Sequence, residues 1–500
     1  MISLGVDCGT QSLKTVALDV ETGKVLRSAQ QKYDLIGGLP PGAAEQHPQD
    51  WVDAMESTIR QVTAGLGDRA SEIAAIGVSG QQHGLVALDE HGEVVRPAKL
   101  WCDTSTAAEC EKIEEAVGGG ERALALGGNR IVPGYTAPKI RWLQDHEPEN
   151  WRATRAVMLP HDYLNFWLTG EAKMEFGDAS GTGFLDVRTR EWCAALVEAT
   201  ADGLREKLPP LGSSLRPVGR VKESLAATLG LPDGVLVSAG GGDNMMGAIG
   251  TGNVGGGVVT ASLGTSGTLY ASTAEPVIDT KGEIAAFCDS TDRWLPLLCT
   301  MNVTLVTELA RELWGWDHGQ FDAEVAATSP GADGLLLLPY LTGERTPSLP
   351  NATGTLHGLT SRNFTPGHLA RAAMEGVTLG LGYGLQRLTE LGLAPKEIRL
   401  TGGGTNSAAW RRICADIFGV PVVCLETGEG AGLGAAVQAA WQVAAEAASD
   451  ASMRDLAVHC VATDESTRVE PKADASAMYA ESIDRMNRLR TALVGAGMLG

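Results

Sequence analysis

The chain has 500 residues, of which 44% are hydrophobic and 20% charged, a composition typical of a soluble globular protein with a sizeable buried core. Because this length exceeds what one hydrophobic core normally serves, we expect two domains. Forty basic and 61 acidic side chains give a formal net charge of −21, which disfavours nucleic acid as a partner, and no apolar run approaches a membrane span.

The nine cysteines are scattered and form no CxxC pair, a pattern that favours reduced, mostly buried thiols over disulfides. The first residues enter an apolar strand directly and do not form a charged and then apolar leader. The cytoplasm is therefore the expected location.

The first predicted element is a β-hairpin. An apolar strand over residues 2–6 meets Asp7, a turn with Gly9 and Thr10, and a returning strand through residues 16–18. Glycine lets the backbone approach a bound group, and exposed N–H groups in a turn form a nest for an anion. A carboxylate beside bound phosphates is the usual binding site of Mg²⁺. The sequence therefore predicts a phosphate-binding turn with Asp7 as its metal-binding residue.

Another polar strand end and a helix follow in the N-terminal half. A buried strand over residues 73–79 leads to the polar residues 81–84 and an apolar segment over residues 85–88, which predicts another hairpin. Helical spacing covers residues 105–117, with Asp103 and Thr104 as candidate caps.

A strand over residues 235–239 runs through three glycines to Asp243, after which residues 245–250 form a short helix. On such a turn the carboxylate of Asp243 could accept a proton from a substrate hydroxyl, or it could cap a helix that begins at Asn244. Because the chain contains the phosphate turn beside Asp7 and, as described below, a second one in its other half, we favour the catalytic interpretation.

The glycine-rich residues 250–257 are the expected crossover between the domains. They contain a GxGxxG pattern at Gly250, Gly252 and Gly255, but it follows a helix instead of a strand, so we interpret it as linker. The GxxxxGK[ST] phosphate loop is absent, which disfavours a P-loop kinase, and the absence of HExxH or regular histidine spacing disfavours a structural metal.

The second phosphate turn opens the C-terminal half. A strand over residues 258–263 meets Gly264 and Thr265 and returns through Leu269 and Tyr270, without an acid at the place that matches Asp7. Two such turns, one in each half, predict a split clamp for phosphates.

Further along, the strand at residues 398–401 ends in Gly402, Gly403 and Gly404, followed by Asn406 and an amphipathic helix over residues 408–418. These glycines either form a plain strand-to-helix turn or provide an open stretch of backbone on which adenine can lie flat. A helix over residues 478–493 is predicted near the end, and the Ala-rich acidic segment 444–464 has no assigned role.

These strand ends suit phosphoryl transfer, which needs a metal held by a carboxylate, backbone donors around the phosphates and an acid–base group near the attacking hydroxyl. With these residues placed, the chain resembles the FGGY carbohydrate kinases, within the actin-like ATPase fold group, over nearly its whole length. Within that family it is most similar to the members that act on D-xylulose. The matching segments are Gly5–Thr10, Ser79–Gly84, Pro133–Lys139 with Trp142, Gly240–Asn244, Ser262–Ser266, Leu338–Leu341 and Gly343–Pro347.

The resemblance implies an α/β fold with two actin-like (ribonuclease H-like) domains whose mixed sheets flank a deep interdomain cleft that closes over the substrates. The expected division is an N-terminal sugar-binding and catalytic domain over residues 1–249, an ATP-binding domain over residues 250–441, and an acidic segment with a terminal helix over residues 442–500. A homodimer is the expectation for this family.

The resemblance also implies a role for each matching residue. Asp243 is the expected general base, and Asp7 is the expected acid that holds Mg²⁺ through water. The expected nucleotide-binding residues are Thr10, Gln11, Gly264, Thr265, Gly402, Gly403, Gly404 and Asn406. The expected sugar-binding residues are Gln82, His83, Asn244 and Asp103. Many similar kinases have Met in place of Gln82. For Glu344 and Arg345 we expect an interdomain or structural role.

The expected reaction is transfer of the γ-phosphate of ATP to the terminal hydroxyl of D-xylulose, which gives D-xylulose 5-phosphate and ADP in pentose catabolism. One alternative is a kinase for another sugar or polyol, such as ribulose, glycerol or gluconate. A second alternative is an actin-like ATPase switch that acts on a protein partner.

Overall fold

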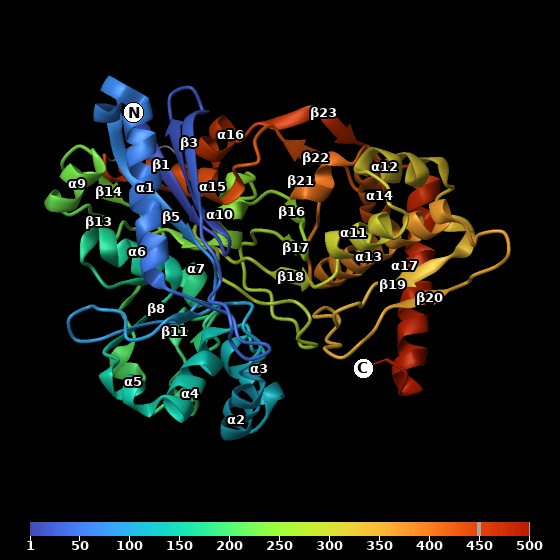
Figure 1. The fold of residues 1–500 in the computed structure, drawn as a ribbon, viewed down its shortest axis with the longest axis horizontal. Helices are drawn as coiled ribbons and strands as arrows, with labels where there is room; N and C mark the ends of the chain where they lie inside the picture. Colours follow the sequence, from blue (N-terminus) through green and yellow to red (C-terminus); the bar gives the residue numbers. More distant parts are fainter. Residues whose placement is uncertain (448–451, 500) are drawn as a thin grey trace.

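The computed structural model describes residues 1–447 and 452–499 and consists of two α/β halves, each built on a mixed sheet (Figure 1). This arrangement confirms the predicted fold class. All nine cysteines are free and most are buried, as their scatter along the chain predicts. Among the helices within the described residues, none has the length and apolar character needed to cross a bilayer.

The N-terminal sheet has the strand order β13-β14-β5-β1-β2-β3, and β15 pairs with the end of β5. Its strands are β1 (Ile2–Cys8), β2 (Ser12–Asp19), β3 (Lys24–Lys32), β5 (Ile73–Gly80), β13 (Gly219–Arg220), β14 (Leu236–Val237) and β15 (Gly241–Gly242). The first three strands form an antiparallel meander, and β5 adds parallel to β1. The carboxyl ends of β1, β5 and β15 therefore meet at one edge of the sheet.

The C-terminal sheet has the order β18-β17-β16-β21-β22-β23. Its strands are β16 (Val258–Leu263), β17 (Gly267–Tyr270), β18 (Leu297–Thr300), β21 (Glu397–Thr401), β22 (Val422–Leu425) and β23 (Thr463–Val469). The core of this sheet repeats the pattern of the first one, since β16, β17 and β18 are antiparallel neighbours while β21 and β22 add in parallel. The two predicted phosphate turns lie at equivalent places, between the first and second strands of each sheet.

Helices cover both sheets. In the N-terminal half they are α1 (Pro48–Leu66), α6 (Pro160–Thr169), α7 (Phe176–Ala179), α9 (Glu223–Leu229) and α10 (Asp243–Gly250), with a separate helical lobe of α2 (Ala107–Val117), α3 (Gly120–Gly127), α4 (Thr136–His146), α5 (Pro148–Ala153) and α8 (Ala194–Thr200). In the C-terminal half they are α11 (Thr304–Leu313), α12 (His318–Ala327), α13 (Pro366–Glu390), α14 (Ala408–Phe418), α16 (Met453–Cys460) and α17 (Ala473–Gly495). Figure 1 shows the lobe below the N-terminal sheet and α17 at the far edge of the other half.

Helix α15 (Gly430–Glu446) joins the two halves. It follows β22 of the C-terminal sheet but packs against β1, β5 and α10 of the N-terminal half (Figure 1). The backbones come close because glycines face the helix: a Cβ on Gly5 would overlap the carbonyl oxygen of Gly432, and one on Gly77 would overlap that of Ala435. The neighbouring residues Leu4 and Val6 face α1 on the opposite side of the sheet, as the alternation of a strand requires.

Three sequence-based predictions differ from the structure. Residues 73–79 and 85–88 do not form a hairpin, because β5 pairs with β1 and β6 (Val86–Leu88) pairs with β8 (Ala156–Met158) of another layer. Local patterning cannot reveal such long-range partners.

The other two differences concern helix ends. The helix predicted from residue 105 begins at Ala107, because the carboxylate of Asp103 accepts the N–H of Ser105 and holds it outside the helix. The terminal helix begins at Ala473, five residues before the predicted 478. The Ala-rich segment contains the end of α15, then α16 and the start of β23, and its residues 448–451 lie outside the described residues.

The glycine contacts of α15 predict a marked effect of one methyl group. Gly5→Ala should lower the free energy of unfolding by about 2 kcal/mol, because the added Cβ must push the helix backbone away. Urea unfolding followed by tryptophan fluorescence measures this change. Gly37→Ala is the matched control, since Gly37 has no neighbour within 4 Å of an added Cβ, and equal stability of both variants would contradict the close-packing argument.

Candidate functional site

A cavity of about 620 Å³ lies between the two sheets and is lined by residues from both halves. Its lining residues include Asp7, Lys14, Asp243, Asn244, Ser262, Thr268, Tyr270, Gly402, Gly403, Thr405, Asn406, Glu429 and Gly430. Asp7 and Asp243, which the sequence places at two separate strand ends, thus face one space.

Asp7 lies near the carboxyl end of β1, where its Oδ1 accepts a hydrogen bond from Ser79 Oγ at 3.1 Å. Burial, together with the nearby Glu429 carboxylate, raises the pKa of Asp7 to about 6. Glu429 pairs with Lys14 at 2.5 Å across the cavity. A bound cation would relieve the burial cost of these carboxylates.

The donor set near Asp7 fits Mg²⁺ only in part. Carboxylate oxygen is the preferred ligand of this ion, but within the described residues no group of three His, Cys, Asp or Glu side chains could hold a metal. Mg²⁺ commonly keeps several waters and binds phosphates through one or two carboxylates, and a site of that kind is compatible with Asp7 and Glu429.

Asp243 is the first residue of α10 and directly follows β15. Its Oδ1 accepts hydrogen bonds from the backbone N–H of Asn244 at 2.8 Å and from Asn244 Nδ2 at 2.9 Å. These bonds do not make it a cap, because Gly242 is the N-cap residue of the helix. Burial, and secondarily the charges of Asp7 and Asp178, raise the pKa of Asp243 to about 7. This value suits a group that must accept a proton near neutral pH.

Each of the two Gly-Thr turns is closed by a hydrogen bond from the N–H of its glycine, but the acceptor lies three residues on in the first turn and two residues on in the second. The N–H of Gly9 donates to the carbonyl of Ser12, and the N–H of Gly264 donates to the carbonyl of Ser266, each at 3.1 Å. Thr10 Oγ1 is engaged within the protein, since it donates to Gln81 Oε1 at 3.2 Å and accepts the Nε1–H of Trp101 at 2.9 Å.

None of Thr10, Gln11, Gly264 and Thr265 lines the cavity itself, but residues flanking both turns do. Asp7 and Lys14 flank the first turn, and Ser262 and Thr268 flank the second. Both turns thus lie at the border of the cavity.

The strand end after β21 forms one wall of the cavity. Gly402, Gly403 and Asn406 line it, and Gly403 has no neighbour within 4 Å of an added Cβ, so its backbone presents an open surface. Gly404 points the other way, because a Cβ there would come within 2.9 Å of the Trp410 ring.

His83 lies beyond Gln82 in a strained backbone conformation with φ of 64°. Its ring lies 4.9 Å from the ring of Tyr135 and 5.7 Å from that of Phe287. Burial, reinforced by the charges of Lys139 and Arg345, lowers the pKa of His83 well below its usual value, so the ring is neutral. Its Nδ1 is buried and, among the described residues, has no hydrogen-bond partner.

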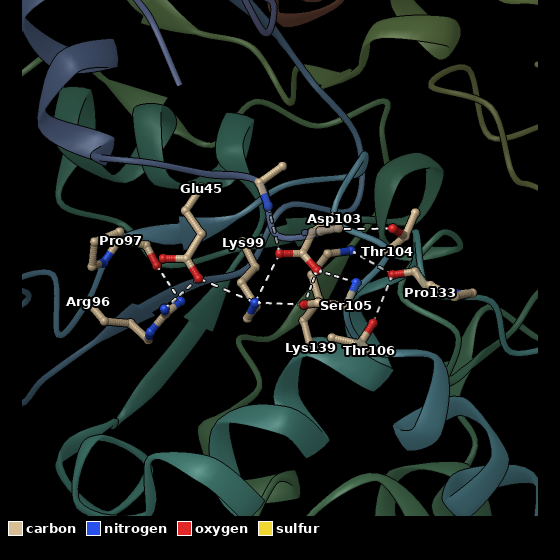
Figure 2. Close-up of polar contacts among 12 residues, drawn as sticks. Glu45, Arg96, Pro97, Lys99, Asp103, Thr104, Ser105, Thr106, Pro133 and Lys139 are labelled. Carbon is tan, nitrogen blue, oxygen red and sulfur yellow. Dashed lines mark hydrogen bonds and ion pairs between the residues drawn. The ribbon is translucent and has the colours of Figure 1, made fainter. Parts of the chain in front are cut away.

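Asp103 lies in a buried network of charges (Figure 2). Its Oδ2 accepts from Ala44 N at 3.0 Å and Lys99 Nζ at 2.9 Å, and its Oδ1 accepts from Ser105 N at 3.0 Å and Oγ at 2.6 Å. Burial alone would raise the pKa of Asp103, but these donors outweigh it and lower the pKa below its usual value. Four donors occupy this carboxylate, which favours a structural role over direct contact with a ligand.

The same network accounts for two residues with no role assigned from sequence. Lys139 lies beside Pro133 (Figure 2), and its Nζ donates to the carbonyl oxygens of Pro133, Gly134 and Tyr135 and so fixes the loop that carries Tyr135. The ring of Trp142 lies 4.1 Å from Lys99 Nζ, a cation–π contact.

One residue at the cavity, Glu429, was not identified from sequence, whereas Glu344 and Arg345 were expected to have an interdomain or structural role. Glu429 lies in a glycine-rich loop that a search for glycine-flanked acids could have found. Glu344 is buried, and its carboxylate accepts Met301 N at 2.7 Å and Asn302 Nδ2 at 3.1 Å, in agreement with a structural role. Arg345, from the C-terminal half, is exposed and lies near His83 of the other half.

The network around Asp103 generates a stability prediction. Asp103→Asn should lower the free energy of unfolding by about 3 kcal/mol, because it leaves the buried Lys99 ammonium with one partner fewer. Urea unfolding measures this loss. Glu56→Gln, which removes one partner of an exposed helix pair with Arg60, is the control and should cost less than about 0.5 kcal/mol. A similar loss in the two variants would show that the buried network adds no stability.

The comparisons with known proteins agree with this geometry. The N-terminal domain of the FGGY family of carbohydrate kinases matches residues 2–250, and its C-terminal domain matches residues 259–443. A xylulose kinase from Haemophilus influenzae is 43% identical over 437 residues, which cover 86% of this chain and 88% of that protein. A xylulose kinase from Streptomyces rubiginosus is 40% identical over 440 residues, with 86% of each chain covered.

Solved structures give the same result. The crystal structure of xylulose kinase from Rhodospirillum rubrum superposes with a TM-score of 0.90 at 29% identity and covers 99% of both chains. Together with the two domain matches, this similarity shows that the chain belongs to the FGGY family of carbohydrate kinases.

Proposed function

We propose that the chain is an ATP-dependent kinase that transfers the γ-phosphate of ATP to the terminal hydroxyl of D-xylulose and releases D-xylulose 5-phosphate and ADP. The observation that carries this proposal is one cavity onto which two half-buried carboxylates, Asp7 and Asp243, both open. The xylulose kinases at 43% and 40% identity support D-xylulose as the acceptor.

Asp243 is the general base. Both hydrogen bonds that its carboxylate accepts from Asn244 arrive at Oδ1, so Oδ2 is the oxygen that receives the proton of the sugar hydroxyl. As that proton moves, the hydroxyl oxygen forms a bond to the γ-phosphorus while the bond to the β-phosphate oxygen breaks, and ADP leaves. Because the base must be ionised, its raised pKa makes turnover fall as the pH drops through about 7.

Asp7 is the metal-binding residue. Mg²⁺ held there through water would neutralise negative charge on the phosphates, the usual contribution of this ion to phosphoryl transfer. The turns at Thr10–Gln11 and Gly264–Thr265 supply backbone donors to the phosphates. The adenosine lies along Gly402–Gly404 and Asn406, where the backbone of Gly403 is open.

The sugar occupies the space beside His83 and Asn244. The neutral ring of His83 can both donate and accept a hydrogen bond, which suits recognition of hydroxyl groups. The rings of Tyr135 and Phe287 pack beside that of His83.

The domain division stays as predicted, with residues 1–249 holding the sugar, residues 250–441 holding ATP and residues 442–500 packing on the domains. We also propose a homodimer and a cytoplasmic location. The nine free thiols support a reducing compartment.

The sugar preference is tested by coupled ADP release with D-xylulose, D-ribulose, L-ribulose, glycerol and gluconate. We expect the highest kcat/KM for D-xylulose. A clear preference for an acceptor other than a ketopentose would overturn the substrate assignment. ATP consumption that no sugar stimulates would instead favour a partner-driven ATPase.

The base assignment is tested by Asp243→Asn, which keeps the shape of the side chain but removes the proton acceptor. Sugar-dependent turnover should fall at least about a hundredfold, while nucleotide affinity, measured by calorimetry, changes little. The exposed Asp202→Asn variant is the control for the loss of one negative charge. Turnover of Asp243→Asn close to that of the control would remove Asp243 from this role.

A further inference from the structure

A row of hydrogen-bonding side chains runs from Asp243 into the interior of the N-terminal half. Asn244 Nδ2 donates to Asp243 Oδ1 at 2.9 Å and also to Gln82 Oε1 at 2.7 Å. Behind Gln82 lies Asp178, whose pKa is raised by burial, although the His161 ring and the Gln82 amide oppose that shift. Gly242 makes room for this arrangement, because a Cβ there would lie 2.6 Å from Gln82 Cγ and 3.1 Å from Asp178 Oδ1.

Asp178 belongs to a fully buried charged cluster. Its Oδ2 contacts His161 Nδ1 at 2.8 Å, and Asp162 Oδ1 contacts the other ring nitrogen, Nε2, at 3.0 Å. Burial alone would lower the pKa of His161, but the two carboxylates raise it well above its usual value, so the ring is a cation whose Nδ1 donates to Asp178 while its Nε2 lies in an ion pair with Asp162. The ring is thereby held at two points and fixes Asp178 in turn.

The charge on this cluster dictates the orientation of both amides. An ionised carboxylate only accepts hydrogen bonds, so Asp178 must face the Nε2 donor of Gln82. Gln82 Nε2 and Asp178 Oδ1 are both buried, and among the described residues neither makes a hydrogen bond, so a free donor and a free acceptor lie on the two side chains that pack beside Gly242. Gln82 Oε1 is thereby turned towards Asn244, which must present Nδ2 to it and to Asp243.

This geometry leaves Gln82 little capacity to bind a sugar. The side chain is 4% exposed, its oxygen already accepts from Asn244, and its nitrogen is buried against Asp178. A ligand would have to displace one of these contacts. The carboxylate of Asp243, by contrast, reaches the cavity.

We propose that Gln82 is a positioning residue and not a sugar ligand. The buried Asp162–His161–Asp178 cluster fixes which end of the Gln82 amide faces Asp178, and Gln82 in turn fixes the orientation of the Asn244 amide. Asn244 then orients the Asp243 carboxylate. This proposal rests on the base role proposed for Asp243. It assigns Asp178 to the same row, although Asp178 touches neither the cavity lining nor Asp243 itself.

Gln82→Met tests the proposal, because Met has a similar size but can form neither a hydrogen bond with Asn244 nor a polar contact with Asp178. We expect kcat with D-xylulose to fall about fivefold, the equivalent of one hydrogen bond, while KM for D-xylulose stays within about twofold. Gln442→Met is the matched control: Gln442 is also buried and hydrogen-bonded, to Ala239 N and Ser214 O, but it lies outside the row. It should lower the melting temperature and leave kcat unchanged.

A second pair of variants tests the connection to Asp178. Asp178→Asn allows its amide to present a donor to Gln82, which would reverse both amides, so kcat should fall by a similar factor with KM unchanged. Because both substitutions break the same row, the kcat of the double variant Gln82→Met/Asp178→Asn should lie no more than about twofold below that of the slower single variant.

Four results would overturn the proposal. A rise in KM at constant kcat in Gln82→Met would make Gln82 a sugar ligand, and multiplied losses in the double variant would separate Asp178 from the row. Unchanged kcat and KM in Gln82→Met would separate Gln82 from the row, even if Asp243→Asn is inactive and the base role stands. If Asp243→Asn remained active, the base role and this proposal would fail together.

Discussion

The two halves of this kinase meet through a backbone-to-backbone contact. Helix α15 begins at the end of the C-terminal sheet and lies on the N-terminal sheet, where glycines replace side chains at the closest points. Gly250 and Gly434 extend the same contact to α10, since a Cβ on either residue would overlap a carbonyl oxygen of the opposite helix. Because α10 carries Asp243 at its first turn and α15 begins beside Glu429, this one contact sets both sides of the cavity relative to each other.

The site carries costs that a purely structural cavity would avoid. Asp7 and Asp243 are both half-buried, and each has a pKa raised by desolvation and by another carboxylate. His83 adopts a left-handed backbone conformation that is uncommon for a residue with a Cβ. Unfavourable terms of this kind collect at functional sites, where the surrounding structure holds them in place.

Much of the site could be predicted because its signals are local. Asp7, Asp243 and the Gly-Thr turns each lie directly after an apolar strand, and parallel strands bring their carboxyl ends together. The long-range partners could not be predicted in this way. Nothing near residue 80 in the sequence shows that β5 pairs with β1, and nothing near Asp178 shows that it lies behind Gln82.

Asp103 shows the opposite limit. A motif match assigned it to the substrate, whereas its four hydrogen-bond donors favour a role in supporting the lobe, and only the packed structure reveals them. Lys139 and Trp142 likewise acquire a role only through the carbonyl oxygens and the ammonium group that they contact.

The ion pair between Lys14 and Glu429 has a consequence for which form of nucleotide can enter. Among the described residues that line the cavity, the ionisable carboxylates are Asp7, Asp243 and Glu429, and Lys14 is the single basic side chain. Its charge is already matched by Glu429 at 2.5 Å. A bare polyphosphate would therefore meet like charge with no spare counterion, which supports the proposal that the nucleotide enters the cavity together with Mg²⁺.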